Sequence, residues 1–113
     1  MSISIGNVCI DTTGLAGASV FWQAVTGYEI ASSDGATTYL QDPAKSAVGL
    51  SLQRVPEPRV GKNRTHVNLS TDDLACQVDR ISELGATVVR RFDEDGWVVL
   101  ADPAGNQFCV IAA

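Results

Sequence analysis

Polar and reactive side chains recur at every second position in four short segments of the chain. Side chains two residues apart in a β-strand point to the same face of a sheet. The set includes the single histidine and two of the three cysteines. It comprises Asn7, Cys9 and Asp11; Gly49, Ser51 and Gln53; His66, Asn68 and Ser70; and Gln107, Cys109 and Ile111. The spacing therefore predicts four strands that share one mixed, polar face.

The intervening positions are apolar, and we expect them to form a core beneath two helices. They are Val8, Ile10, Val48, Leu50, Leu52, Val67, Leu69, Phe108 and Val110. The same alternation puts Leu40 and Leu100 in this core. It leaves beside the polar face Tyr39, Gln41, Trp97, Val99 and Ala101. Aromatic walls with a few polar groups are typical of a small-molecule pocket, whereas a simply solvated sheet face is the alternative.

Two similar halves supply these segments. Strand patterns occur at 3–10, 28–30, 37–41 and 48–55 in the first half, and at 65–70, 86–91, 97–101 and 107–111 in the second. Helical patterns follow the first strand of each half, at 15–26 and from Asp72 or Asp73 to Leu84, and Gly27 and Gly85 are suitable C-terminal stops. The order strand, helix, three strands therefore occurs twice, and the predicted fold class is α+β.

An internal duplication is supported by a nearly constant spacing of 58 to 60 positions between matched landmarks. The most specific match is a Leu-x-Asp-Pro-Ala string, which begins at Leu40 and again at Leu100. The same spacing makes His66 the repeat partner of Asn7. With 113 residues, the chain has the length of one domain. We predict a single domain with module one at about 1–55, a connector at 56–63 and module two at 64–113.

The composition narrows the classes of function. A hydrophobic fraction of 45% and a charged fraction of 19% are those of a globular protein, and a net charge of -5 argues against nucleic acid as a partner. No stretch approaches the roughly 20 apolar residues of a membrane helix, so no membrane partner is expected. The cysteines are odd in number and form no CxxC pair. We therefore expect a cytoplasmic protein.

The chain resembles the vicinal oxygen chelate superfamily, the glyoxalase, bleomycin-resistance and dioxygenase group, and most closely its uncharacterised glyoxalase-like branch. The resemblance covers almost the whole chain. It rests on Val8-Cys9-Ile10-Asp11, Phe21-Trp22, Gly27-Tyr28-Glu29, Leu52-Gln53-Arg54-Val55-Pro56-Glu57, Arg64-Thr65-His66-Val67-Asn68-Leu69, Leu84-Gly85-Ala86 and Asp102-Pro103-Ala104-Gly105-Asn106-Gln107-Phe108-Cys109. It implies two tandem βαβββ modules whose curved mixed sheets form a cup, and usually a homodimer.

The resemblance also implies where metal ligands would lie. Metal-using members take His, Gln or Glu ligands from the first and last strands of each module. Here those positions hold Asn7, His66 and Cys109, with Gly49, Ser51 or Gln53 as the candidates on the last strand of module one. Only His66 is a customary ligand, and Mg, Mn and Fe sites favour carboxylate and imidazole. No cofactor is therefore expected, and a bound divalent metal remains the alternative.

Two other uses of His66 and Cys109 stay open. They could hold a softer ion such as zinc, although zinc sites need about three or four protein ligands. Alternatively, Cys109 could act as a thiolate with His66 as its base and Asn7 orienting the imidazole.

We predict a metal-independent protein that binds a small planar or aromatic molecule in the cup, against Tyr39 and Trp97. The predicted ligand-binding residues are Asn7, Tyr39, Ser51, Gln53, His66, Trp97 and Cys109. The first alternative is a lyase, isomerase or dioxygenase-type enzyme with an atypical site around His66 and Cys109. The second is a purely structural or interaction module.

Overall fold

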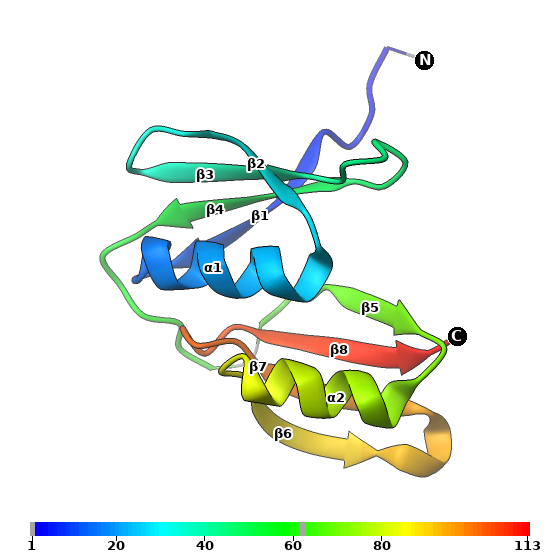
Figure 1. Cartoon of the computed structure of the whole chain (residues 1–113). Coiled ribbons are helices and arrows are strands. Elements are labelled where there is room, and N and C mark those ends of the chain that lie inside the picture. Colours follow the sequence, from blue (N-terminus) through cyan, green and yellow to red (C-terminus); the bar gives the residue numbers. More distant parts are fainter. Residues whose placement is uncertain (1, 62) are drawn as a thin grey trace. The chain divides into compact units, whose positions relative to one another are not determined.

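The computed structural model describes residues 2–61 and 63–113 and contains two compact units, Met1–Pro58 and Arg59–Ala113. The first unit contains β1 (Asn7–Thr12), α1 (Leu15–Thr26), β2 (Glu29–Ser33), β3 (Thr37–Gln41) and β4 (Gly49–Arg54). The second contains β5 (Asn68–Thr71), α2 (Leu74–Glu83), β6 (Thr87–Phe92), a short 3-10 helix (Asp93–Asp95), β7 (Trp97–Ala101) and β8 (Gln107–Ala112). Figure 1 shows one helix beside each sheet. The predicted division into one domain with a connector at 56–63 stays a prediction.

Each unit is built on a four-stranded mixed sheet of the same topology. The strand order is β1-β4-β3-β2 in the first unit and β5-β8-β7-β6 in the second. The pairs β1–β4 and β5–β8 are parallel, and the other pairs are antiparallel. The helix α1 packs on β3 and β4, and α2 packs on β8. The predicted α+β class with two βαβββ modules is therefore confirmed.

Apolar side chains between helix and sheet form the core of each unit. In the first unit, Phe21 and Trp22 are almost fully buried and meet edge to face, with ring centroids 5.3 Å apart. Burial of a large apolar side chain contributes roughly 1.5–3 kcal/mol, so these contacts hold α1 to its sheet. The other buried apolar residues on the predicted core face include Leu40, Leu50, Leu52, Leu100, Phe108 and Val110. The alternation in the sequence therefore identified the helix-covered face.

The predicted starts of the first strand of each module are wrong. β1 begins at Asn7, which lies opposite Gly49, the first residue of its partner β4, so pairing starts where the partner strand begins. β5 begins at Asn68, opposite Cys109, the third residue of β8. Val48 was expected in the core but is 46% exposed. It lies just before β4, where the strand alternation no longer applies.

The duplication extends to individual hydrogen bonds. The Thr12 hydroxyl accepts a hydrogen bond from the backbone amide of Gly14 at 3.1 Å. In the second unit, the Thr71 hydroxyl accepts one from the backbone amide of Asp73 at 3.0 Å. Both edge hairpins also contain a register shift at equivalent positions, between Ile30 and Ser32 and between Val88 and Arg90. These local details support the equivalence of the two modules independently of the strand order.

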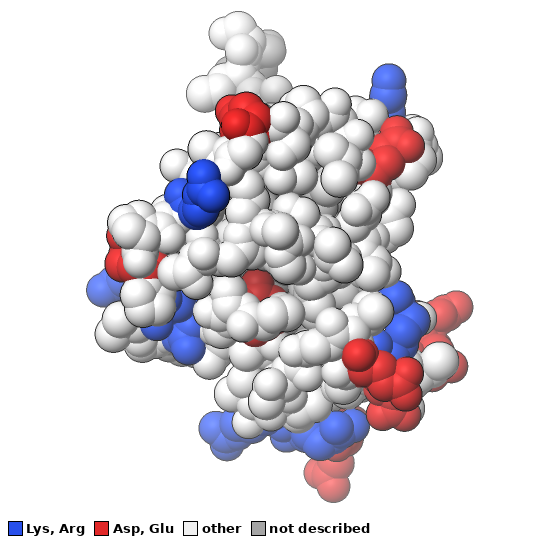
Figure 2. Space-filling view, turned by 60° about the vertical axis from the view of Figure 1, so that its left-hand side comes forward, with Lys and Arg blue, Asp and Glu red and all other residues white. Residues whose placement is uncertain are grey.

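The surface carries charges of both signs, interspersed among uncharged side chains on the face that Figure 2 shows. In the part of the chain that the structure describes, neither helix has the length and apolar character needed to cross a membrane.

Candidate functional site

The exposed face of the first sheet brings Asn7 and Ser51 into direct contact. They come from the neighbouring parallel strands β1 and β4, and the Ser51 hydroxyl donates a 2.9 Å hydrogen bond to Asn7 Oδ1. Ser51 is only 3% exposed. Farther along the same strands, the Cys9 thiol donates to Gln53 Oε1 at 3.7 Å. The predicted residues Asn7, Ser51 and Gln53 therefore share one row of polar contacts.

The sheet registers show which residue of β4 corresponds to Cys109 of β8. Leu40 lies opposite Leu50, and its repeat partner Leu100 lies opposite Phe108. The next residues along β4 and β8 are Ser51 and Cys109, which are therefore equivalent. Of the three candidates left open by the sequence, Ser51 is the residue at the last-strand position of module one.

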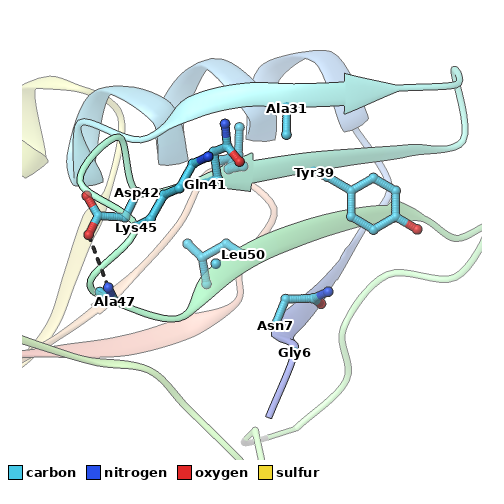
Figure 3. Close-up of a pocket in the computed structure, with 11 residues that line it drawn as sticks. Gly6, Asn7, Ala31, Tyr39, Gln41, Asp42, Lys45, Ala47 and Leu50 are labelled. Carbon is cyan, nitrogen blue, oxygen red and sulfur yellow. Dashed lines mark hydrogen bonds between the residues drawn. The ribbon is translucent and has the colours of Figure 1, made fainter. Parts of the chain in front are cut away.

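Tyr39 lies opposite Ser51 on β3 and borders a pocket of about 270 Å³ in the first unit. The pocket is lined by Gly6, Asn7, Ala31, Tyr39, Leu40, Gln41, Asp42, Lys45, Ala47, Gly49 and Leu50. In Figure 3, Asn7 and Tyr39 lie toward one end of the pocket and Gln41 and Lys45 toward the other. Strands β1, β3 and β4 and the loop that follows β3 therefore all contribute to one concave site.

Gly49 keeps the strand side of this pocket open. A Cβ atom at this position would lie 2.8 Å from the carbonyl oxygen of Leu40, closer than Cβ atoms approach other heavy atoms in proteins. A larger residue would therefore force apart β3 and β4.

The loop after β3 is organised by the carboxylate of Asp42. Its two oxygens accept hydrogen bonds from the amides of Ala44, Ser46 and Ala47 and from the Ser46 hydroxyl. Donation by these groups, first of all by the Ala44 amide, holds the pKa of Asp42 below its usual value. The loop therefore presents an ionised carboxylate whose Oδ2 accepts three hydrogen bonds and whose Oδ1 accepts one.

Lys45 is at the tip of this loop with a left-handed backbone, φ 55. Its repeat partner in the second unit is Gly105, with φ 90. Within residues 2–61 and 63–113, no ion pair joins the Lys45 ammonium group to a carboxylate. A lysine thus occupies a backbone conformation for which the other module uses glycine.

In the second unit, His66 is exposed and precedes β5. Cys109 is 6% exposed, lies opposite Asn68 and donates its backbone N–H to the carbonyl of Val67 at 2.9 Å. The segment carrying His66 is therefore tied to the strand carrying Cys109.

Trp97 of β7 stacks on Phe92 of β6, with ring centroids 3.9 Å apart and an interplanar angle of 11°. The guanidinium of Arg90 lies 4.7 Å from the centroid of the Phe92 ring. Val99, two residues after Trp97, lies opposite Cys109. Trp97 therefore belongs to an aromatic cluster on the same sheet face as Cys109.

The residues at the positions where metal-using members carry ligands do not fit a divalent metal site. In the first unit they are an amide and a hydroxyl that bond to each other, and Mg²⁺ and Mn²⁺ favour carboxylate and water oxygens. Among the described residues, no three His, Cys, Asp or Glu side chains are grouped so that they could hold a metal ion.

Sequence reasoning missed the contribution of Lys45 and of the Asp42 loop. The repeat contained the signal, because Asp42-Pro43-Ala44-Lys45 aligns with Asp102-Pro103-Ala104-Gly105. A lysine at the position of a turn glycine indicates a side chain retained at a conformational cost.

Solved structures share this fold. A glyoxalase/bleomycin resistance protein/dioxygenase family enzyme from Burkholderia phytofirmans matches with a TM-score of 0.78 and 20% identity, over 97% of this chain and 98% of that chain. The fosfomycin resistance protein FosX from Listeria monocytogenes, complexed with Mn(II) and 1S,2S-dihydroxypropylphosphonic acid, matches with a TM-score of 0.77 and 14% identity, over 98% and 90%. The trypanothione-dependent glyoxalase I of Leishmania major matches with a TM-score of 0.76 and 14% identity, over 98% and 87%.

No curated protein matches the chain. Residues 7–111 match the family model described as a glyoxalase-like domain, which spans β1 to β8. The fold neighbours come from the glyoxalase, bleomycin-resistance and dioxygenase superfamily. By this match over nearly its full length, the chain belongs to the glyoxalase-like domain family.

Proposed function

We propose that this protein binds a small planar or aromatic molecule in the pocket of its first unit, without the divalent metal used by metal-dependent relatives. The observation that carries the proposal is the hydrogen bond from Ser51 to Asn7 Oδ1 at 2.9 Å. It joins the two positions of this unit at which metal-using members would place ligands. Both side chains are neutral and engaged with each other, next to an open pocket.

The walls of the pocket suit an organic ligand. Tyr39 is 43% exposed and offers a ring face beside Ala31 and the strand residues of β3 and β4. Binding sites for small molecules combine such apolar surface with a few polar groups that fix orientation. Asn7 supplies one of these groups, because its Oδ1 is held by Ser51 and its amide N–H groups remain available.

The fold neighbours support a small-molecule site in general. FosX was solved with a dihydroxypropylphosphonic acid and Mn(II), and the Leishmania protein is a glyoxalase I. The metal is the feature that does not transfer, because the Asn7 and Ser51 donors do not suit it.

We also propose His66, Trp97 and Cys109 as ligand-binding residues of the second unit, and Gln53, which accepts a hydrogen bond from Cys9, as a further ligand-binding residue of the first. We further propose a homodimer, as the resemblance implies, and a cytoplasmic location, as the number and spacing of the cysteines favour. Light scattering from the purified chain should give twice the 11.9 kDa monomer mass. A monomer over the whole concentration range would rule out the dimer and leave the ligand site unaffected.

The test is a titration of the full chain with benzamide, a neutral aromatic probe, in buffer with a metal chelator. Backbone amide NMR signals of Asn7, Tyr39, Gln41 and Gly49 should shift together and saturate. A Tyr39→Ala variant should weaken binding, whereas Tyr28→Phe, which does not line the pocket, should not. Saturable shifts that require an added divalent metal, or no shifts at these residues, would overturn the proposal.

A further inference from the structure

The geometry points to a small organic carboxylate as the ligand class of the first-unit pocket, with Lys45 as the residue that pairs with the carboxylate. This inference rests on the proposed function, since it assumes that the pocket binds a small molecule. It adds the charge of that molecule and the residue that selects it.

The backbone of Lys45 is the first support. A left-handed conformation costs a residue with a Cβ atom roughly 1–2 kcal/mol relative to right-handed backbone, and glycine avoids this cost. The equivalent loop of the second unit uses Gly105 with φ 90, whereas the first has Lys45 with φ 55. Backbone strain of this kind is concentrated at functional sites. The turn by itself would favour glycine at this position. The presence of lysine is therefore explained by a role of its side chain.

The distribution of hydrogen-bonding groups is the second support. Asp42 lines the pocket beside Lys45, but its oxygens already accept four hydrogen bonds within its own loop. The Asn7 carbonyl accepts from Ser51. The groups left for a ligand are mainly donors: the Lys45 ammonium and the Asn7 amide N–H groups. Donors of this kind bind an anionic oxygen group.

Gln41 adds one acceptor to the pocket. Its side-chain nitrogen donates to Glu29 Oε1 at 3.1 Å, which leaves its carbonyl oxygen for a ligand donor. The remaining lining is apolar or backbone, with Tyr39 at the end of the pocket that also holds Asn7 (Figure 3). The lining holds one cation, Lys45, and one ionised carboxylate, Asp42, whose charge is bound by the amides of its own loop. This charge pattern matches at most a monoanion carrying a ring or short chain, rather than a multiply charged ligand.

The test compares benzoate with benzamide, which have the same ring and differ in charge, by amide NMR titration of the full chain. Benzoate should bind more tightly by about two- to fivefold, because Lys45 is exposed and solvent weakens an exposed ion pair. Lys45→Gln should remove this preference, because it keeps a polar side chain at this position and removes the positive charge. Lys45→Gly should do the same in a loop whose backbone is relaxed, so misfolding cannot account for the loss.

Two controls complete the design. Lys45→Arg keeps the cation and should keep the preference for benzoate. Arg54→Gln removes one positive charge from an exposed position of the same unit, outside the pocket, and should also keep it. Equal binding of both probes to the unaltered chain, or an undiminished preference in Lys45→Gln, would overturn the carboxylate inference and leave the proposed function standing. Absence of shifts with both probes would overturn both.

Discussion

The Ser51 hydroxyl donates a 2.9 Å hydrogen bond to Asn7 Oδ1 across the parallel strands β1 and β4. This bond fixes which end of the Asn7 amide is the acceptor, and so turns the amide N–H groups of a pocket-lining residue into the available donors. The bond also joins the two positions of the first unit from which metal-using relatives would take ligands. The same contact thus connects the altered ligand positions with the chemistry of the pocket.

A double-mutant cycle tests the Asn7–Ser51 contact. Ser51→Ala and Asn7→Ala should each lower the free energy of unfolding, and the coupling between them should be about 0.5–1 kcal/mol, the usual net value of a hydrogen bond. Urea unfolding of the four proteins measures it. Strictly additive effects would show that the bond contributes nothing to stability.

Replacing Lys45 by glycine and replacing Gly105 by alanine should change the free energy of unfolding in opposite directions. Lys45→Gly should raise the free energy of unfolding by about 0.5 kcal/mol, because relief of left-handed strain exceeds the entropy cost of glycine. Gly105→Ala, at φ 90, should lower it by about 1 kcal/mol. Lys45→Ala is the matched control and should bring no gain, since alanine keeps the strain. A loss of stability in Lys45→Gly would contradict the claim that the left-handed backbone of Lys45 is strained.

The stability of the fold should fall at acidic pH as Asp42 becomes protonated. Its pKa is lowered in the folded state, chiefly by the Ala44 amide, so its contribution is present above the unfolded pKa of about 3.9 and is lost as the pH falls through the folded value. The difference in melting temperature between the unaltered chain and Asp42→Asn should therefore be largest near neutral pH and shrink below about pH 3.9. A constant difference across this range would contradict the role of the charged form.

The stability of the fold should fall at alkaline pH as Tyr28 loses its proton. Burial, and then the nearby charge of Asp42, raise the pKa of Tyr28, whose hydroxyl donates to the carbonyl of Val48 at 2.9 Å. The neutral phenol therefore stabilises the fold below the unfolded pKa of about 10, and this contribution is lost as the pH rises through the folded value. Ultraviolet titration in a Tyr39→Phe background should place Tyr28 above its value in denaturant. A Tyr28 that ionises at the same pH in both states would refute this assignment.

The elements with the strongest local signals were predicted correctly. Helix α1 and strands β3 and β7 have the predicted bounds. Their ends are marked by neighbouring residues in the sequence: a glycine follows the helix, and Asp-containing turns follow the two strands. The start of β1 depends on where its distant partner strand begins, and no local pattern encodes that. The register that equates Ser51 with Cys109 has the same non-local origin.

The candidate site was predicted in part. Strand alternation found Asn7, Tyr39 and Ser51 on one face, and the structure places them on neighbouring strands. Lys45 was missed because its position reflects the backbone of a loop rather than a strand period. The shared site expected between Tyr39 and Trp97 stays a prediction, as these residues belong to different units.

The central claim is that this family member binds its ligand without a divalent metal. Calorimetric titration of the chelator-treated, dialysed chain with Mn²⁺ tests it most directly, with His66→Ala as the comparison, because His66 is the one customary ligand at these positions. We predict no saturable binding of Mn²⁺ in either protein, and benzamide binding to the chelator-treated, unaltered chain that added Mn²⁺ does not change. Binding of one Mn²⁺ per chain that is abolished by His66→Ala would contradict the account.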